Sequence, residues 1–464
     1  MNDCTFIILG ASGDLAKRKL LPALYQLFAH NRLNKFVIVG AALDALTPAQ
    51  LLAQAREHIE QCDETLYQKF GEYVHYQQLD VRKPEDFVAL HTRVESLELT
   101  YTLSGNRIAY LAVGAHFFCG ITQQLAASRL VKKWNAKDAV HHRIVYEKPF
   151  GHDAQSARDI NACIARLYDE RQIYRIDHYL TKELVGNIAL VRFTNCVFEP
   201  LWNNRYIDSV QVVLSEKVCV GTRGAYFDKY GALCDVVQNH MLEIVALLGM
   251  EAPQKLTGEY IRDERVKVLS KIHVVDALFA QYEGYRQEKN VAPDSTTETF
   301  ALVYLTIQNH RWAGVPFYLK TGKCLDKKET IIHIKFKQVD CLLARNCPTD
   351  SNYLTIRVTP DASFSLNLNA KKPGPANEII PVTMDFCHSC IFGMVTQEAY
   401  EIIFEEVMRD EQSVSVRFDE IEYAWRVIDQ IKQKQVPVYP YKQGSTGPEQ
   451  VHDFERKHGM RWRS

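Results

Sequence analysis

The stretch Thr5-Phe-Ile-Ile-Leu-Gly-Ala-Ser-Gly-Asp-Leu-Ala-Lys17 combines an apolar run with a glycine-rich turn near the start of a 464-residue chain. The apolar run predicts a buried strand, and residues 15–28 have the apolar spacing of a helix. Gly10, Gly13 and Ala16 occupy G-x-x-G-x-x-A positions between the two. Small residues there let backbone N–H groups and a helix N-terminus approach a pyrophosphate. We therefore expect a nucleotide-binding turn, with a purely structural role for the glycines as the alternative.

The first 150 residues repeat this alternation of apolar runs and helical patterns. We expect strands at 6–9, 36–40, 74–78, 108–113 and 144–146. A helix is expected at 48–61, where Thr47 and Gln50 form a capping box around Pro48. This alternation predicts a parallel sheet covered by helices, that is, an α/β N-terminal Rossmann-like dinucleotide-binding domain, which we place at residues 1–177.

Beyond residue 180 the pattern changes to the two-residue period of long strands. Apolar and polar residues alternate in 332–337 and again in 364–368, and helices are expected at 235–248 and 397–408. We expect residues 178–464 to form an α+β domain for substrate binding and oligomerisation, with a large, mainly antiparallel sheet that has one buried face. Because a broad apolar face is seldom left exposed to solvent, we also expect this domain to form a homo-oligomer.

The composition favours a small-molecule partner. Lysine plus arginine (55) nearly equals aspartate plus glutamate (56), so no net field would attract nucleic acid or an anionic membrane. No run of 18 or more apolar residues occurs, and the chain passes almost directly from Met1 into an apolar run without room for a signal peptide. We expect a cytoplasmic protein without nucleic-acid or membrane partners.

The twelve cysteines are scattered, and Cys387-His-Ser-Cys390 is the single close pair in the sequence. A zinc site would need a second pair of ligands, and redox use would need a thioredoxin-like context. We therefore expect ordinary thiols and no metal, and the sequence leaves open whether the close pair has a role.

The residues expected to bind a dinucleotide cluster around the first turn. They are Gly10, Ala11, Ser12, Gly13, Asp14, Leu15 and Lys17, with Asp44 after the second strand and Lys148 after the fifth. A carboxylate at Asp44 would accept hydrogen bonds from ribose hydroxyls and repel a 2′-phosphate. This favours NAD over NADP, with a solvent-facing Asp44 as the equal alternative.

The segment Arg175-Ile-Asp-His-Tyr-Leu-Thr-Lys-Glu183 gathers polar groups suited to a phosphate. Helical spacing would place His178, Tyr179 and Lys182 along one helix edge. An ammonium, a phenol and an imidazole converging from one side serve a phosphate dianion well. Core packing of the His-Tyr pair is the alternative.

The segment Asp235-Val-Val-Gln-Asn-His240 supplies a base. Asp235 and Asn239 lie one helical turn apart, and His240 adjoins that face. Oxidation of an alcohol requires removal of the hydroxyl proton as hydride leaves the same carbon, and a histidine titrating near neutral pH suits that task. Asp177 is the candidate carboxylate to fix the histidine tautomer.

These residues resemble the glucose-6-phosphate dehydrogenase family over essentially the whole chain. The matching segments are Gly10–Lys17, Glu147-Lys-Pro-Phe-Gly151, Arg175–Leu180, Phe198–Asn203, Asp235–His240, Thr297-Glu-Thr-Phe300, Trp312–Phe317, Thr321-Gly-Lys323 and Tyr441–Ser445 through Trp462. Relatives carry arginine just after the second strand, where this chain has Leu43 and Asp44. NADP preference is therefore an open point.

The resemblance implies roles for individual residues. It implies that His240 is the general base and Asp177 its partner, and that His178, Tyr179 and Lys182 hold the sugar phosphate. The residues implied to contact the sugar are Glu216, Asp235, Lys323 and Lys328, while Lys148 would lie between sugar and nicotinamide and precede a cis proline bond.

The implied reaction oxidises glucose 6-phosphate at C1 to 6-phosphoglucono-1,5-lactone, with hydride transfer to NADP or NAD, in a homodimer or homotetramer. Two alternatives stay open. One is a dehydrogenase of another sugar 6-phosphate, since the same phosphate anchor would serve it. The other is a catalytically silent, nucleotide-binding regulator.

Overall fold

The structure is a computed structural model that describes residues 3–339, 351–375, 378–387, 390, 391, 393 and 397–463. The chain divides into two compact units. Unit 1 comprises Met1–Thr181, Lys255–Arg262 and Thr396–Glu422; unit 2 comprises Lys182–Gln254, Asp263–Val395 and Tyr423–Ser464. Whether the functional boundary lies between residues 177 and 178 stays a prediction.

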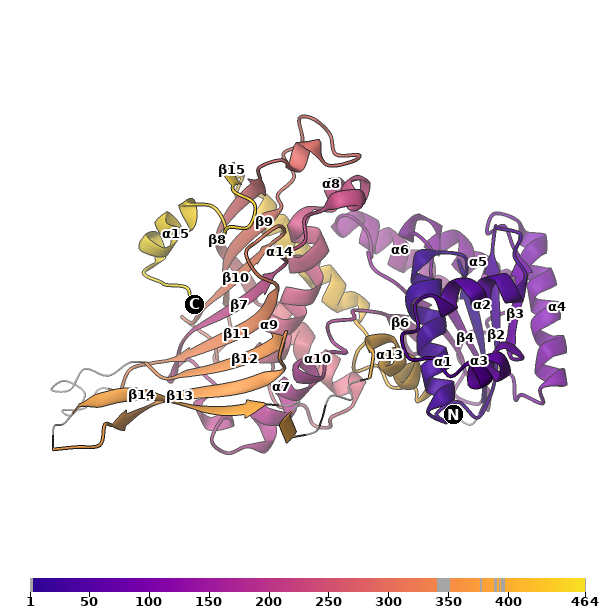
Figure 1. The fold of residues 1–464 in the computed structure, drawn as a ribbon, viewed down its shortest axis with the longest axis horizontal. Coiled ribbons are helices and arrows are strands. Elements are labelled where there is room, and N and C mark those ends of the chain that lie inside the picture. Colours follow the sequence, from indigo (N-terminus) through magenta and orange to yellow (C-terminus); the bar gives the residue numbers. More distant parts are fainter. Residues whose placement is uncertain are drawn as a thin grey trace. The chain divides into compact units, whose positions relative to one another are not determined.

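Unit 1 contains a six-stranded sheet in the order β3-β2-β1-β4-β5-β6, in which every pairing is parallel (Figure 1). Its strands are β1 (Asp3–Leu9), β2 (Lys35–Ala42), β3 (Val74–Gln78), β4 (Arg107–Leu111), β5 (His142–Tyr146) and β6 (Ile173–Arg175). This is the strand order of doubly wound dinucleotide-binding folds, and the predicted Rossmann-like class is confirmed. The sequence did not predict β6, because a strand of three residues is too short to show a hydrophobic period.

Helices cover both faces of this sheet. They are the π-helix η1 (Ala16–Leu20), α1 (Leu21–Ala29), α2 (Pro48–Arg56), α3 (Glu64–Gly71), α4 (Pro84–Thr100), α5 (Phe118–Ala127), α6 (Ala154–Leu167) and α13 (Ala399–Met408), with short 3₁₀ turns η2 (Ala115–Phe117) and η3 (Glu170–Gln172). The predicted capping box of Thr47 and Gln50 is confirmed. Along β1, Phe6 and Ile8 belong to one core cluster and Ile7 and Leu9 to another, so both faces are buried.

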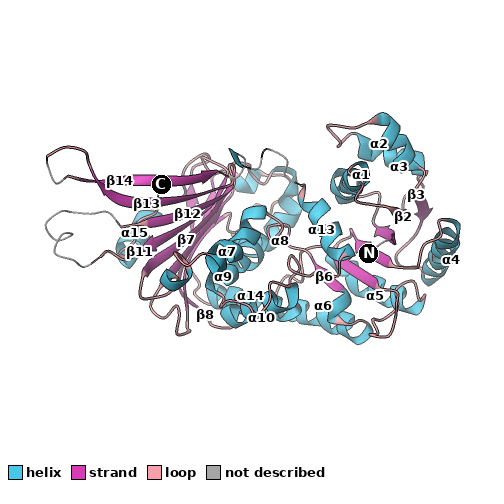
Figure 2. Cartoon of the chain, turned by 90° about the horizontal axis from the view of Figure 1, so that it is seen from below, coloured by secondary structure: helices cyan, strands magenta, loops and turns pink. Residues whose placement is uncertain are grey.

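Unit 2 contains a nine-stranded sheet in the order β14-β13-β12-β11-β7-β10-β9-β8-β15 (Figure 1), and its strands are among those drawn in magenta in Figure 2. Its strands are β7 (Ile207–Ser215), β8 (Ile272–Tyr282), β9 (Phe300–Ile307), β10 (Pro316–Gly322), β11 (Glu329–Phe336), β12 (Tyr353–Thr359), β13 (Ser363–Lys371), β14 (Ile379–Cys387) and β15 (Val438–Tyr441). Six of its pairings are antiparallel, and β7–β10 and β8–β15 are parallel. The expected large, mainly antiparallel sheet is therefore confirmed as a mixed sheet.

Helices accompany this sheet. Those of unit 2 are α7 (Glu183–Thr194), α8 (Gly224–Ala232), the π-helix η6 (Leu233–Met241), α9 (Leu242–Gly249) and α15 (Gln450–His458), with 3₁₀ turns η4 (Glu199–Leu201), η5 (Gly221–Arg223) and η7 (Tyr285–Gln287). Two further helices, α10 (Gly258–Leu269) and α14 (Phe418–Lys432), have residues in both units. The stretch Gly221–Gly249 is long and apolar enough to cross a membrane, but 94% of its most apolar window is buried inside the protein, as in a core helix.

The burial of the long strands differs from the alternation that the sequence predicts. In β11, Ile332 and Ile334 are buried, but so is His333, at 5% exposure, where it hydrogen-bonds the Thr355 hydroxyl (3.0 Å). Both faces of the central strands are therefore covered. The predicted exposed face exists on β14, where Met384 is 63% exposed.

Six cysteines are paired within the described part of the chain. Disulfides join Cys119 to Cys163 in unit 1, and Cys219 to Cys324 and Cys387 to Cys390 in unit 2. The expectation of ordinary thiols is wrong for these residues, because sequence spacing cannot reveal pairs 44 and 105 residues apart. His388 and Ser389 lie outside the described residues.

Candidate functional site

The glycine turn of unit 1 connects β1 to the first helix. Gly10 has a φ of +90°, and a Cβ there would lie 2.8 Å from Val113 Cγ1. A Cβ on Gly40 in the neighbouring strand β2 would lie 2.9 Å from Ala11 Cβ. The turn closes with a hydrogen bond from Gly13 N to Gly10 O (3.0 Å). Residues without side chains let a pyrophosphate come close to the backbone N–H groups of such a turn.

The helix after the turn differs from the regular helix that the sequence predicts. Residues Ala16–Leu20 form a π-helix, and α1 begins only at Leu21. Two of its three cations are paired: Lys17 Nζ lies 3.5 Å from Asp14 Oδ1, and Lys19 Nζ lies 3.3 Å from Glu398 Oε2. Asp14 is exposed, whereas Ala11 is buried and Ser12, Gly13 and Leu15 are partly buried around the turn.

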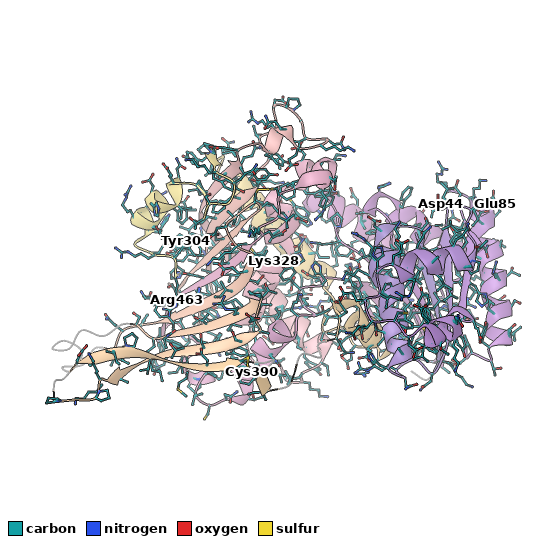
Figure 3. The ribbon with its side chains drawn as sticks, viewed as in Figure 1. Asp44, Glu85, Tyr304, Lys328, Cys390 and Arg463 are labelled. Carbon is teal, nitrogen blue, oxygen red and sulfur yellow. A yellow bond between two sulfur atoms is a disulfide. The ribbon has the colours of Figure 1, made fainter. Side chains whose placement is uncertain are left out.

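Asp44 lies on the surface of unit 1, two residues after β2 (Figure 3). Its backbone carbonyl accepts a hydrogen bond from the Tyr76 hydroxyl at 2.5 Å. Its neighbour Leu43 is 60% exposed. This hydrogen bond fixes the backbone of Asp44 beside the carboxyl ends of the parallel strands. Dinucleotide-binding folds contact the adenine ribose at this edge of the sheet.

Lys148 follows β5, and its bond to Pro149 is cis, as the resemblance implies. The preceding Glu147 accepts a hydrogen bond from the Tyr110 hydroxyl on β4. Burial raises the pKa of the Glu147 carboxyl, while the hydrogen bond from Tyr110 lowers it. Tyr110 and Glu147 therefore hold the backbone that carries Lys148; the sequence marked Glu147 only as part of a matching segment, and Tyr110 not at all.

The predicted helix through His178, Tyr179 and Lys182 is wrong. Asp177, which is 2% exposed, accepts the Tyr179 backbone N–H at its Oδ1 (2.9 Å), and the segment forms a turn. The helix α7 begins only at Glu183. An aspartate that bonds the backbone two residues ahead competes with helix formation. His178 and Tyr179 still lie together, with ring centroids 5.1 Å apart.

Three of the residues implied to bind the sugar meet in unit 2. Because β7 and β10 are parallel neighbours with Ser215 paired to Gly322, the residues that follow them, Glu216 and Lys323, lie side by side. Lys323 Nζ donates to Glu216 Oε1 (2.7 Å) and lies 3.5 Å from Asp235 Oδ2. Lys323 is 6% and Asp235 is 4% exposed. A buried ammonium between two carboxylates offers donors and acceptors for sugar hydroxyls.

Asp235 and His240 belong to the π-helix η6, not to the regular helix that the sequence predicts. A π-helix bonds residue i to residue i+5, so its turn is wider than that of the regular helix from which the sequence spacing was argued. The Asn239 amide donates to Cys234 O within the helix (3.2 Å). His240 is 3% exposed. Single π-helical turns occur often at functional sites.

Lys328 does not join the Lys323 cluster. It is exposed just before β11 (Figure 3), and within residues 3–339 no hydrogen bond or ion pair links it to the cluster. Two residues absent from the sequence-based set do contact the cluster. The Tyr226 hydroxyl donates to Asp235 Oδ1 (3.4 Å), and the Phe227 ring lies 5.5 Å from Lys323 Nζ. Both are on α8, directly before the π-helix, and no motif marked them.

Comparison with known proteins covers both units. The family model described as "Glucose-6-phosphate dehydrogenase, NAD binding domain" matches residues 7–187, and that described as "Glucose-6-phosphate dehydrogenase, C-terminal domain" matches residues 189–463. "Glucose-6-phosphate 1-dehydrogenase" of Bacillus subtilis is 38% identical over 98% of this chain and 97% of its own. "Glucose-6-phosphate 1-dehydrogenase 5, cytoplasmic" of Arabidopsis thaliana is 37% identical over 98% of this chain and 91% of its own.

Solved structures agree with these sequence matches. A structure described as "Glucose-6-phosphate dehydrogenase in complex with its substrate glucose-6-phosphate" has a TM-score of 0.91 and 32% identity, covering 99% of this chain and 98% of the other. Glucose-6-phosphate 1-dehydrogenase from Mycobacterium avium has a TM-score of 0.87 and 31% identity, with the same coverage. The chain belongs to the glucose-6-phosphate dehydrogenase family.

Proposed function

We propose that this protein oxidises glucose 6-phosphate at C1 to 6-phosphoglucono-1,5-lactone. The observation that carries the proposal is the cluster of the buried Lys323 and Asp235 with the partly buried Glu216, with His240 on the same π-helix as Asp235, in a member of this family. The cluster supplies hydrogen-bond donors and acceptors for sugar hydroxyls. The nicotinamide ring, when bound, supplies the hydride acceptor.

His240 removes the proton of the C1 hydroxyl as hydride leaves the same carbon. Its imidazole is suited to this step because it titrates near neutral pH when unperturbed. Asp177 is its carboxylate partner, fixing the tautomer and stabilising the imidazolium that forms. Burial of Asp177 at 2% exposure supports this role, since a buried carboxylate interacts strongly with a nearby cation.

His178, Tyr179 and Lys182 hold the 6-phosphate. The turn that begins at Asp177 supports this assignment, because it fixes the backbone between the carboxylate and the first two phosphate ligands. The ammonium of Lys182 acts as a point charge for the dianion, and the phenol and imidazole add direction.

The coenzyme is a nicotinamide dinucleotide held by the turn Gly10–Lys17, with Lys148 beside the nicotinamide. The glycines support this assignment, because a Cβ on Gly10 would clash with Val113 and one on Gly40 with Ala11, so the tight turn requires residues without side chains. Asp44 makes NAD the preferred coenzyme over NADP, since its carboxylate repels a 2′-phosphate and accepts hydrogen bonds from free ribose hydroxyls.

A direct assay tests the proposal. Purified protein should reduce NAD or NADP with glucose 6-phosphate and hardly at all with glucose, because the phosphate anchor is then empty. If the protein oxidised another sugar 6-phosphate but not glucose 6-phosphate, that other sugar phosphate would be its substrate. No turnover with either coenzyme would leave a silent nucleotide-binding protein and defeat the proposal.

The protein functions as a homo-oligomer, a dimer or tetramer, in the cytoplasm. The partner is a second copy because Met384 and Val382 on β14 remain 63% and 38% exposed on the edge of a broad sheet. The cytoplasmic names of Arabidopsis relatives support the location. Light scattering of the purified protein at several concentrations tests the first point, and a monomer at all of them would contradict it.

A further inference from the structure

The segment Thr297-Glu-Thr-Phe300 leads into β9 in unit 2 and has no role in the site described so far. Glu298 contacts the start of the π-helix η6 in two ways. Its Oε1 accepts the backbone N–H of Leu233 (3.0 Å), and its backbone carbonyl accepts the N–H of Ala232 (3.0 Å). Ala232 is the N-cap and Leu233 the first residue of the π-helix, so Glu298 contacts the junction at which α8 ends and the π-helix begins, where the Leu233 N–H also meets Tyr230 O.

Gly231 lies at the kink between α8 and this π-helix, with φ +63° and ψ 179°. A Cβ on Gly231 would lie 2.7 Å from Glu298 Cδ. The carboxyl group therefore occupies the space in which any side chain at position 231 would have to lie. The kink, the bare glycine and the carboxyl group form one interlocked arrangement, because each determines the position of the others.

The same segment also holds the sugar-binding lysine. The Thr299 carbonyl, one residue beyond Glu298, accepts the backbone N–H of Lys323 (2.9 Å). Asp235 follows Leu233 by two residues, and its Oδ2 lies 3.5 Å from Lys323 Nζ. Thus the segment fixes the backbone on both sides of the Lys323–Asp235 pair.

We infer that Glu298 is a positioning residue, which fixes the start of the π-helix so that Asp235 and His240 project into the sugar site. The inference rests on the proposed function, because it assigns Glu298 the task of orienting groups that act only if the sugar binds there. Glu298 itself touches neither substrate nor coenzyme. An acceptor oxygen at this position is what the task requires.

The ionisation state of Glu298 is a separate matter. Burial raises the pKa of its carboxyl from 4.5 to about 7, against the hydrogen bond from Leu233 N–H and the charge of Lys432, which lower it. Cys234 on the π-helix and Tyr285 on η7 also interact with its charge. Both forms of the group retain an acceptor oxygen for Leu233, so the positioning role survives protonation.

The test compares Glu298→Ala, Glu298→Gln and Glu288→Ala in the full chain. Glu288 is a matched control, because it is also a partly buried glutamate of unit 2 and accepts one hydroxyl, that of Tyr282 (2.9 Å), away from the π-helix. For Glu298→Ala we expect kcat/KM for glucose 6-phosphate to fall by about 10- to 100-fold, as for a misplacement of about 1 Å. Glu298→Gln should recover most of the loss, because its amide oxygen still accepts the Leu233 N–H.

Coenzyme affinity, measured by quenching of protein fluorescence, separates positioning from general damage. It should remain unchanged in Glu298→Ala, because the glycine turn belongs to unit 1. Equal kcat/KM in Glu298→Ala and the unaltered protein, or no recovery in Glu298→Gln, would overturn the inference while leaving the proposed function intact. An unaltered protein that is inactive would instead defeat the proposed function.

Discussion

The nucleotide turn of unit 1 and the sugar cluster of unit 2 are assembled in opposite ways. The turn consists of consecutive residues 10–17, and its geometry is enforced by the backbone of Gly10 at φ +90°. The cluster joins Glu216 and Lys323, which are 107 residues apart, through the parallel pairing of β7 and β10. A local site follows from its own sequence, whereas a distributed site follows only from the topology of the sheet.

This difference predicts where substitutions act. Changes in the turn alter coenzyme binding through a few backbone groups, while changes in unit 2 act through helices and strands that deliver side chains from a distance. The predictions below separate the two regions, from the largest expected effect to the smallest.

Replacement of the proposed base should have the largest effect. For His240→Asn we expect kcat to fall by a factor of about 100 or more, which is about 2.7 kcal/mol of barrier, because a positioned base is lost. Affinity for glucose 6-phosphate should change little in equilibrium binding. An unchanged kcat would remove His240 from the reaction.

Removal of the phosphate anchor should act on binding. For Lys182→Ala we expect KM for glucose 6-phosphate to rise by about tenfold or more, since a charge-assisted contact to the dianion is lost. Lys267→Ala is the control, because this lysine is 67% exposed and pairs with Glu264 on the surface of unit 2. The same KM in both variants would exclude Lys182 as the anchor.

Charge reversal at Asp44 should alter coenzyme choice and nothing in unit 2. In Asp44→Arg the ratio of kcat/KM with NADP to that with NAD should rise by about tenfold, because a guanidinium attracts the 2′-phosphate. Glu85→Arg, an exposed acid of the same unit (Figure 3), should leave the ratio as it was. A ratio unaffected by Asp44→Arg would mean that the carboxylate faces solvent alone.

The raised pKa of Glu298 predicts a small, pH-dependent change in stability. Because the folded-state value, about 7, lies above the unfolded value of 4.5, ionisation opposes folding, and this penalty grows as the pH rises from 4.5 through 7. Above pH 7, the free energy of unfolding of Glu298→Gln should therefore exceed that of the unaltered protein by an amount on the order of 2 kcal/mol. Thermal unfolding should show the two proteins converging near pH 4, and a gap independent of pH would contradict the shift.

The sequence predicted the fold better than the local geometry of the site. Apolar runs located five of the six strands of unit 1, because strands buried on both faces are continuous in hydrophobicity. The period of β11 predicted a strand correctly but placed His333 in solvent, since alternation cannot reveal a second covering layer. The return of Thr396–Glu422 to unit 1, where Phe404 packs against Phe6 at 5.5 Å, left no trace in the sequence.

The sequence identified the residue types of the candidate site but not the backbone conformation of the segments that carry them. His178, Tyr179 and Lys182 were expected on a helix, but the hydrogen bond from Tyr179 N to Asp177 Oδ1 forms a turn instead. The two π-helices were read as regular helices, because their apolar spacing is similar. Tyr226 was not singled out, and Glu298 appeared only within the matching segment Thr297–Phe300 without a role, because their contacts with Asp235 and Leu233 are revealed only by the folded chain.

The account depends on Asp177 and His240 acting together as carboxylate and base. A double-mutant cycle on kcat tests this most directly. We measure Asp177→Asn, His240→Asn and the double variant with glucose 6-phosphate under saturating coenzyme. If the carboxylate works through the imidazole, the double variant will be no slower than His240→Asn alone, because the carboxylate has nothing left to orient. Losses that multiply, as for two independent sites, would contradict the account.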